Sequence, residues 1–366
     1  MAFFTICGLP FHNWIMGVME KSVQRPSFLR TVTFLLGVIA SCHVAAMSSN
    51  SALQEFASLY KKEWGSTERC KETSLNRFSV CSNVLRNEGN APFALYQDSD
   101  AKGTVVLVHG LSDSPFFMRE LAKILFDEGY TVLVPLLPGH GLRDAEDDMS
   151  DWDLAERWQH HVSEVIAIAQ KMDDTLLVGG FSTGGALTVS HYLSADSGID
   201  GIMLFSGALA LSDNAESMSR IWGIKVLAKI IDGSYVTHGP NPFKYPNVAG
   251  FAGLELMDVI NQVRDAFDEG KTITVPVFSA HSQADATTPI SGVETLMSHS
   301  SGPNTFFVID ESYRLCHADL VVNTRLLREM KFNEKMVNER EECAVPKANP
   351  LFDNMALMLK SYLNQF

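Results

Sequence analysis

The sequence is poor in cysteine and has no cluster of basic residues. Only 6 of its 366 residues are Cys, and no C-x-x-C pair or His/Cys group has zinc-site spacing, so a structural metal ion is not expected. Lys and Arg number 29 against 43 Asp and Glu, a net charge of −14. Because a phosphate-binding surface needs clustered basic residues, the composition argues against nucleic acid as a partner. The 46% apolar content is that of a globular chain with a large core.

Residues 1–47 are predicted to be a targeting segment. An apolar run over residues 32–40 follows three basic residues, Lys21, Arg25 and Arg30. This pattern is typical of a secretory signal, and the run is too short to span a bilayer comfortably. We therefore expect an exported protein that is periplasmic, membrane-anchored or secreted.

Three fates of this segment stay open. Residues 39–42 resemble a bacterial lipobox, which would make a lipidated Cys42 the mature N-terminus. Residues 44–46 fit an ordinary signal-peptidase site, and the segment could also remain as an uncleaved anchor. Because the chain is acidic, attachment to an anionic membrane would require the lipid or the apolar segment.

Export would permit disulfide bonds. Four cysteines follow Cys42, and their spacing favours two local pairs, Cys70–Cys81 and Cys316–Cys343. The alternative is four buried free thiols.

From residue 104 onward, short β-rich runs alternate with helical patterns. Strands are expected at 104–108, 131–134, 175–178, 202–205, 272–280 and 305–309, and helices at 115–128, 152–172, 183–194 and 351–363. This alternation predicts an α/β fold, a mostly parallel sheet with helices on both faces. Residues 48–100 are expected to hold a helix and an antiparallel hairpin.

The alternation is interrupted once, and the interruption predicts an inserted cap. The core would comprise residues 48–206 and 271–366, and the cap residues 207–270. The insertion is rich in large apolar side chains: Met218, Trp222, Tyr235, Phe243, Tyr245, Phe251 and Met257. They could line a pocket for an apolar acyl chain or form the cap's own core.

Residues 180–184 read Gly-Phe-Ser-Thr-Gly, a G-x-S-x-G motif between a predicted strand and a predicted helix. In this context Gly180 and Gly184 would relieve collisions at a sharp turn that projects the Ser182 hydroxyl as a nucleophile. The alternative is a glycine-rich turn with a capping serine.

A serine nucleophile needs a general base and a carboxylate that orients the base. Asp285 and His317 follow later predicted strands in the required order, acid before histidine. His281 is the strongest rival base, and Asp310 and Asp319 are the rival acids. His140 lies in a tight loop, and the helical patterns place the remaining candidates at solvent-exposed positions: His160, His161, His191 and His299.

Acyl transfer also needs donors for the developing oxyanion. The N–H of Thr183, directly after the nucleophile, and the N–H of Leu111, in the loop after the first strand, are the candidates. Gly110 would let that loop approach closely, although His109-Gly110 could also be a plain strand-terminating turn.

Residues 100–366 resemble the α/β-hydrolase superfamily, and within it the serine esterases that include bacterial monoacylglycerol lipases. The residues that carry the resemblance are His109-Gly110-Leu111, Pro138-Gly139-His140-Gly141, Gly180 to Gly184, Asp285 and His317. The resemblance implies the superfamily fold, a Ser182–His317–Asp285 triad and no cofactor. The segment between His317 and the last helix departs from the family pattern, as does the exported N-terminus.

The expected function is hydrolysis of carboxylic esters with apolar acyl chains, such as monoglycerides, through an acyl-enzyme. A thioesterase or a C–C hydrolase would use the same triad. A non-catalytic exported lipoprotein is the alternative from a different class, because fold does not prove function.

Overall fold

The computed structural model describes residues 49–71, 74–98, 101–194, 197–231, 235–338 and 342–366. Every described residue belongs to one compact unit, Ala45–Phe366. The predicted targeting segment, residues 1–47 with Cys42, lies outside the described residues. Within the described ranges, no helix combines the length and apolar character needed to cross a bilayer.

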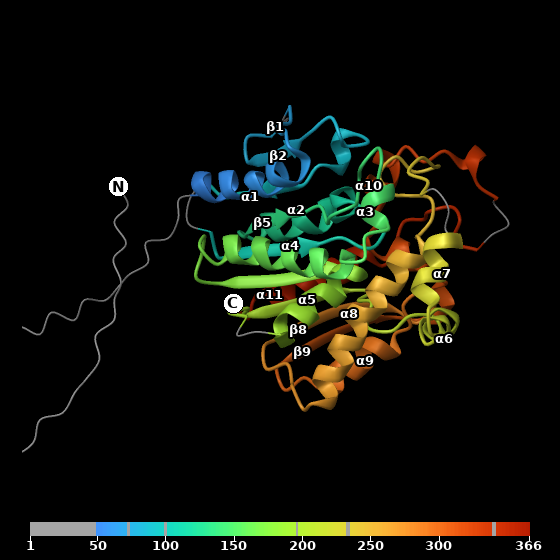
Figure 1. Ribbon diagram of the computed structural model, residues 1–366. Coiled ribbons are helices and arrows are strands. Elements are labelled where there is room, and N and C mark those ends of the chain that lie inside the picture. The colour runs from blue at the N-terminus through green and yellow to red at the C-terminus, as the bar shows by residue number, and fades with distance from the viewer. Residues whose placement is uncertain (1–48, 72–73, 99–100, 195–196, 232–234, 339–341) are drawn as a thin grey trace, which may run out of the picture. The chain divides into compact units, whose positions relative to one another are not determined.

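The described residues form a nine-stranded sheet in the order β1-β2-β3-β5-β4-β6-β7-β8-β9 (Figure 1). Its strands are β1 (Glu68–Arg69), β2 (Arg77–Cys81), β3 (Phe93–Leu95), β4 (Thr104–Val108), β5 (Thr131–Val134), β6 (Leu176–Phe181), β7 (Gly201–Phe205), β8 (Val277–Ser282) and β9 (Asn304–Ile309). The first three pair antiparallel, and the run from β5 to β9 pairs parallel. The predicted mostly parallel sheet is thus confirmed, and its parallel part consists of the six strands expected from the sequence.

Helices lie on both faces of this sheet. They are α1 (Ser49–Trp64), α2 (Arg119–Asp127), α3 (Glu146–Met149), α4 (Leu154–Ala169), α5 (Thr183–Ser194), α6 (Asp213–Ser219), α7 (Ile224–Ile231), α8 (Gly250–Asp268), α9 (Ser291–Ser298), α10 (Thr324–Glu329) and α11 (Phe352–Leu363). Buried residues of α1, α4, α5 and α8 share one hydrophobic cluster, and those of α2, α10 and α11 share another.

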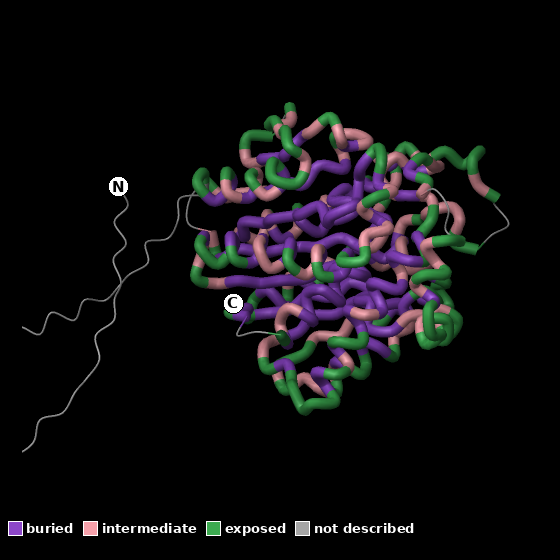
Figure 2. The backbone as a smooth tube through the Cα atoms, viewed as in Figure 1, coloured by how far each residue is buried: buried purple, intermediate pink, exposed green. Residues whose placement is uncertain are grey.

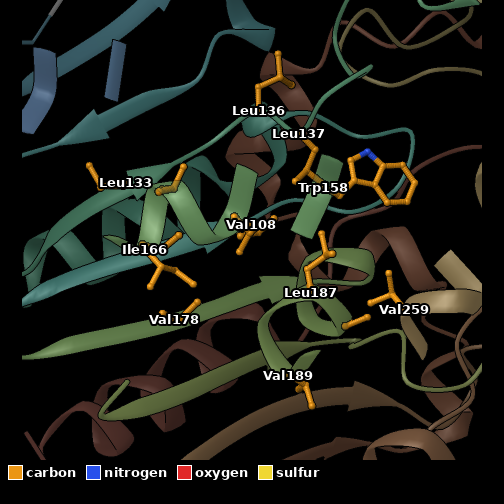
Figure 3. Close-up of a cluster of buried hydrophobic side chains, with 14 of the residues drawn as sticks. Val108, Leu133, Leu136, Leu137, Trp158, Ile166, Val178, Leu187, Val189 and Val259 are labelled. Carbon is orange, nitrogen blue, oxygen red and sulfur yellow. The ribbon is translucent and has the colours of Figure 1, made fainter. Parts of the chain in front are cut away.

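Side chains of the strands belong alternately to the two hydrophobic clusters. In β4, Val106 and Val108 belong to the cluster with α4 and α5, whereas Val105 and Leu107 belong to the cluster with α2 and α11. Successive side chains of a strand point to opposite faces, so a strand covered on both sides reads as a continuous apolar run. Figure 2 shows the buried backbone concentrated along the sheet, and Figure 3 shows the side chains of the first cluster between the strands and α4.

Two predicted elements begin four or more residues later in the structure than expected, and the other boundaries shift by up to three residues. The strand expected over 272–280 begins at Val277, because Pro276 has no N–H to donate to a ladder, and Ile273 makes only an isolated bridge to Ser300. The helix expected over 115–128 begins as a 3-10 turn, Pro115–Met118, before α2.

The predicted insertion, residues 207–270, consists of two structurally different parts. Helix α8 packs against α4 and α5, and its apolar residues, such as Leu256 and Met257, are buried in the first core cluster. Phe251 of the same helix is also buried. Residues 207–249 contain α6 and α7, where Met218 is exposed and Trp222 is 98% exposed. The apolar residues of the insertion are therefore divided between the core and the surface.

His161 is buried, contrary to the prediction that it faces solvent. Helix α1 covers α4 at this point, and the Tyr60 hydroxyl, which accepts the Leu136 N–H at 3.0 Å, lies 3.2 Å from His161 Nε2. Burial lowers the pKa of His161 to about 4, so the ring is neutral and Nε2 accepts the Tyr60 hydroxyl hydrogen. Its neighbour His160, with its side chain 71% exposed, lies on the outer face of the same helix.

These adjacent histidines allow a matched test of pH-dependent stability. Between pH 6.5 and about 4 the unfolded chain protonates His161 while the folded chain does not, so the free energy of unfolding falls as the pH falls. His161→Gln should reduce this slope by up to about 1.4 kcal/mol per pH unit. His160→Gln should change the slope far less, because its side chain is 71% exposed and the burial that lowers the pKa of His161 remains. Urea denaturation across this pH range measures both, and equal slopes in the two variants would contradict the assignment.

Candidate active site

Ser182 lies in the turn between β6 and α5, with a left-handed backbone (φ 53°). Its N–H donates to the Phe205 carbonyl at 3.0 Å, and its carbonyl accepts the Ala208 N–H at 3.0 Å, so the end of β7 holds the turn. A Cβ on Gly184 would lie 2.6 Å from the Val108 carbonyl carbon, closer than real side chains come to backbone. The first turn of α5 therefore packs directly against the end of β4, which places Ser182 at the carboxyl edge of the parallel strands.

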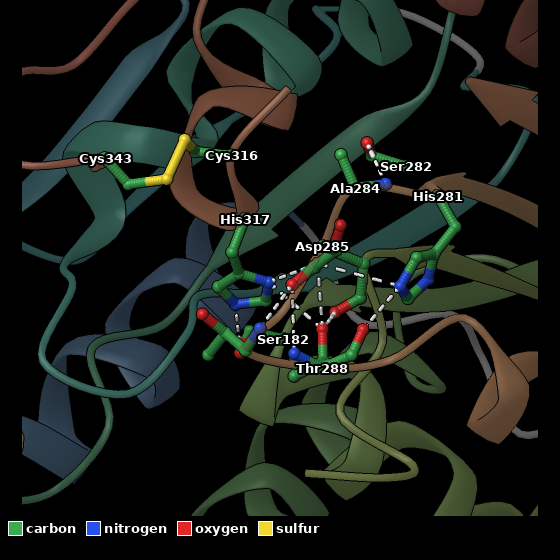
Figure 4. A network of polar contacts seen from close by, with 11 residues as sticks. Ser182, His281, Ser282, Ala284, Asp285, Thr288, Cys316, His317 and Cys343 are labelled. Atoms are coloured by element: carbon green, nitrogen blue, oxygen red, sulfur yellow. Dashed lines mark hydrogen bonds and ion pairs between the residues drawn. A yellow bond between two sulfur atoms is a disulfide. The ribbon is translucent and has the colours of Figure 1, made fainter. Parts of the chain in front are cut away.

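His317 lies between Ser182 and Asp285 (Figure 4). Its Nδ1 is 2.6 Å from Asp285 Oδ2, and its Nε2 is 2.8 Å from Ser182 Oγ. With Nδ1–H donated to the carboxylate, Nε2 presents a lone pair to the serine hydroxyl. Three side chains from the ends of three strands thus form a continuous hydrogen-bonded chain, although up to 135 residues separate them in sequence.

Asp285 is buried and held by several donors. Oδ1 accepts the N–H groups of Thr287 and Thr288 at 3.0 Å, and Oδ2 accepts the Thr288 hydroxyl at 3.0 Å. Burial alone would raise the pKa of Asp285, but the charge and hydrogen bond of His317, with the Thr288 N–H and His281, hold it below its ordinary value. The carboxylate is therefore ionised and fixed in orientation at neutral pH.

The rival bases have other partners. His281 is fully buried, its Nε2 lies 2.7 Å from the Thr288 carbonyl oxygen, and it supports the loop that carries Asp285. His140 is also buried, with Nδ1 3.0 Å from the Pro138 carbonyl oxygen, and burial lowers its pKa to about 3.

The rival acids lie in the same chain region as His317 but serve other groups. Asp310 is exposed and accepts the Ser312 N–H, which caps a 3-10 turn. Asp319 is buried and accepts the Lys347 N–H at 2.9 Å. Among the described residues, no His, Cys, Asp and Glu side chains form a group of three or more that could hold a metal ion.

The loop after β4 and the start of α5 carry the two candidate oxyanion donors. Neither the Leu111 N–H nor the Thr183 N–H donates to another described residue, and Thr183 is the first residue of α5. His109 orients the first of these peptides, because its Nδ1 lies 2.8 Å from the Gly110 carbonyl oxygen while Nε2 accepts the Leu137 N–H. Burial lowers the pKa of His109 to about 4, which keeps the ring neutral for this role.

Part of the insertion is fastened to this loop, a feature that the sequence did not reveal. We call residues 241–245 the strap. The Tyr245 N–H donates to the Ser112 carbonyl at 2.8 Å, and the Ser114 hydroxyl donates to the Phe243 carbonyl at 2.7 Å. Lys244 pairs with the buried Asp113 at 2.8 Å, and the Phe243 ring stacks on Phe116 with centroids 3.7 Å apart.

Arg86 also binds the strap, in addition to the residues of the loop after β4. Its guanidinium donates to the carbonyls of Asn241, Pro242 and Lys244 at 2.9 to 3.1 Å and lies over the Tyr245 ring. The loop after β4 is therefore linked through the strap to the N-terminal part of the core.

Sequence reasoning also missed two residues around the triad. Thr288 contacts both Asp285 Oδ2 and His317 Nδ1 at 3.0 Å, and the Phe181 ring packs on the His317 imidazole with centroids 4.8 Å apart. The Asp-x-x-Thr spacing is a local turn signal that could have identified Thr288 as a partner of Asp285.

Both predicted disulfides are present. Cys70–Cys81 joins the start of the sheet to β2, and Cys316–Cys343 lies directly beside His317 (Figure 4). The four-thiol alternative is therefore wrong.

Residues 99–318, more than half of the chain, match the family model described as serine aminopeptidase, S33. The chain belongs to this family. A thermostable monoacylglycerol lipase from Bacillus sp. (strain H-257) is 37% identical over 101 residues, which cover 28% of this chain and 38% of the lipase. The match thus spans well under two thirds of the length of that relative.

Solved structures of this family's fold are also similar. The Paleococcus ferrophilus monoacylglycerol lipase superposes with a TM-score of 0.51 at 17% identity, covering 75% of this chain and 98% of that one. A soluble variant of the Saccharomyces cerevisiae monoglyceride lipase, bound to a substrate analogue, gives a TM-score of 0.51 at 12% identity, covering 82% and 96%. At these identities the likeness shows the fold, and the predicted α/β-hydrolase fold class is confirmed.

The packing of α5 on β4 can be tested by adding a single methyl group. Gly184→Ala should lower the free energy of unfolding by about 1 to 3 kcal/mol, because the new Cβ overlaps backbone that cannot move away. Gly253→Ala, in the first turn of α8, is the matched control. Its Cβ would have no neighbour closer than 3.9 Å, so the gain in helix propensity should raise stability by about 0.5 to 1 kcal/mol. Denaturant unfolding of both variants measures these values, and changes of the same sign would contradict the packing argument.

Proposed function

We propose that this protein is a serine carboxylic-ester hydrolase. The observation that carries the proposal is the imidazole of His317, whose two ring nitrogens lie at hydrogen-bonding distance from Ser182 and Asp285. Nucleophile, base and orienting acid are the minimum set for acyl transfer through a covalent intermediate. Leu111 and Thr183 supply two N–H groups beside the nucleophile for the oxyanion.

In the first step the Ser182 oxygen attacks the ester carbonyl as its proton passes to His317 Nε2. The carbonyl oxygen becomes negative and is stabilised by the Leu111 and Thr183 N–H groups. The C–O bond to the alcohol then breaks, and His317 returns the proton to the leaving oxygen. Asp285 stays ionised throughout and stabilises the imidazolium.

In the second step water hydrolyses the acyl-enzyme by the same route. His317 takes a proton from the water as its oxygen attacks the acyl carbon, and the Ser182 oxygen leaves and regains that proton. The products are a carboxylic acid and free enzyme, so no oxidant, reductant or metal enters the atom balance.

The proposed substrates are esters with apolar acyl chains, such as monoglycerides. Two kinds of relative support this choice, the Bacillus monoacylglycerol lipase and the two lipases of similar fold. Because the family model carries the description of an aminopeptidase, peptide-like amides are the informative comparison substrates.

Ser182→Ala should lower turnover of p-nitrophenyl esters by about 10⁴- to 10⁶-fold, because the hydroxyl forms the covalent intermediate. The variant should also lose labelling by a fluorophosphonate probe. Ser206→Ala is a suitable control, since Ser206 also directly follows a core strand, is buried and has a positive φ, but its hydroxyl makes no hydrogen bond to a described residue. Activity retained in Ser182→Ala would overturn the proposal.

The substrate class can be tested with a panel of p-nitrophenyl esters from acetate to palmitate, a monoglyceride and an aminoacyl p-nitroanilide. We expect the longer esters and the monoglyceride to have the highest kcat/KM. Preferential cleavage of the anilide would favour peptide hydrolysis instead.

We also propose that the protein is exported. The two disulfides support this, because such bonds persist in oxidising compartments and are rare in the cytosol. The full chain, expressed in a Gram-negative host, should yield a mature form that begins at a lipidated Cys42. Mass spectrometry of the mature N-terminus decides this point. A start after Ala46 indicates ordinary signal cleavage, and a cytoplasmic chain that retains residues 1–41 contradicts export.

A further inference from the structure

The segment between α10 and α11, which departs from the family pattern, lies against the loop that carries His317. We call residues 343–349 the brace. The disulfide joins Cys343 to Cys316, the residue directly before His317 (Figure 4). The Lys347 N–H donates to Asp319 Oδ1 at 2.9 Å.

Asn349 completes the attachment with two further hydrogen bonds. Its backbone N–H donates to the Val322 carbonyl at 2.8 Å, and its side-chain amide donates to the Leu320 carbonyl at 2.9 Å. The brace therefore contacts the histidine loop both before and after His317, and every attachment point lies within five residues of it.

The histidine loop has little regular structure of its own. His317 begins a single 3-10 turn, His317–Val321, and the residues before it, 311–314, are exposed. Such short turns have poorer hydrogen-bond geometry than α-helix. The imidazole contacts Phe181 and its polar partners, but the backbone that carries it needs support from outside the loop.

The burial of Asp319 also indicates that the contact between the brace and the histidine loop is specific. It is only 3% exposed, and burying a carboxylate is costly unless it is hydrogen-bonded. Burial raises its pKa to about 6, and the Lys347 N–H is the donor that it receives from the brace. A side chain at this position that served packing alone would be apolar.

We propose that Cys316, Cys343 and Asp319 are positioning residues that hold His317 in line with Ser182 and Asp285. The proposal rests on the proposed ester hydrolase function. Reaction rates are steeply sensitive to the placement of catalytic groups, and a displacement of about 1 Å can lower turnover by about 100-fold. Because the brace acts on the base and not on the acyl pocket, its loss should lower kcat and leave KM nearly unchanged.

The chain itself offers a matched control for the disulfide. The double variant C316S/C343S removes the brace disulfide, and C70S/C81S removes the other one, which ties β2 to its edge neighbour β1. In C316S/C343S we expect kcat on a p-nitrophenyl ester to fall by about 10- to 100-fold, with KM within about twofold of wild type. The rate of fluorophosphonate labelling should fall in parallel. In C70S/C81S kcat should stay within about threefold of wild type.

Asp319 provides a test that leaves both disulfides intact, for the case that C316S/C343S does not fold. D319A removes the acceptor for the Lys347 N–H, and D319N keeps an acceptor oxygen there without the charge. We expect kcat to fall in D319A and to return close to the wild-type value in D319N. Thermal unfolding of each variant ensures that the assays compare folded proteins.

The outcomes separate this proposal from the proposed function. A wild-type chain that neither hydrolyses esters nor labels at Ser182 contradicts both. If the wild type is active, two results overturn the brace alone: a C316S/C343S variant no more impaired in kcat than C70S/C81S, or a D319N variant as impaired as D319A.

Discussion

The close approach of helix α5 to strand β4 is the constraint on which the rest of the site depends. The glycine at 184 lets the first turn of the helix contact the backbone of Val108, and the chain between β6 and α5 must then turn within very few residues. Ser182 takes the left-handed backbone that this turn requires. The same geometry places Thr183, whose N–H has no acceptor among the described residues, directly after the serine, so the proposed nucleophile and one proposed oxyanion donor share one structural cause.

The other two side chains of the proposed triad are held by contacts that are mostly polar and buried. Asp285 Oδ1 accepts two N–H groups from its own loop. Its Oδ2 accepts the Thr288 hydroxyl and contacts His317. This arrangement resolves the electrostatic conflict of a buried carboxylate, because donors and the imidazole stabilise its charged form. His281, which looked like a rival base, serves the same loop through the carbonyl of Thr288.

The features of the fold and site that could be predicted from the sequence are those that depend on residues close together in the chain. The parallel strands are continuous apolar runs, and the turn at Ser182 is a five-residue pattern, so both were predictable from short windows. The strap was not, because the contacts of Arg86 and Ser114 with it join residues about 130 to 160 positions apart through backbone carbonyls, which any residue type supplies. The burial of His161 was missed for a similar reason, since only the docking of α1 with Tyr60 makes that face of α4 an interior one. Of the contacts made by the brace, the Cys316–Cys343 disulfide was predictable from cysteine spacing, whereas those of Lys347 and Asn349 were not.

The guanidinium of Arg86 also bears on the order in which the molecule assembles. It is the group that joins the antiparallel N-terminal part of the sheet to three carbonyls of the strap, more than 150 residues later in the chain. Contacts of such long sequence separation carry a large loop-closure entropy and form after local structure. The geometry of the loop after β4 therefore depends, through the strap, on contacts between chain segments more than 150 residues apart, so a change at Arg86 can alter this loop without touching it.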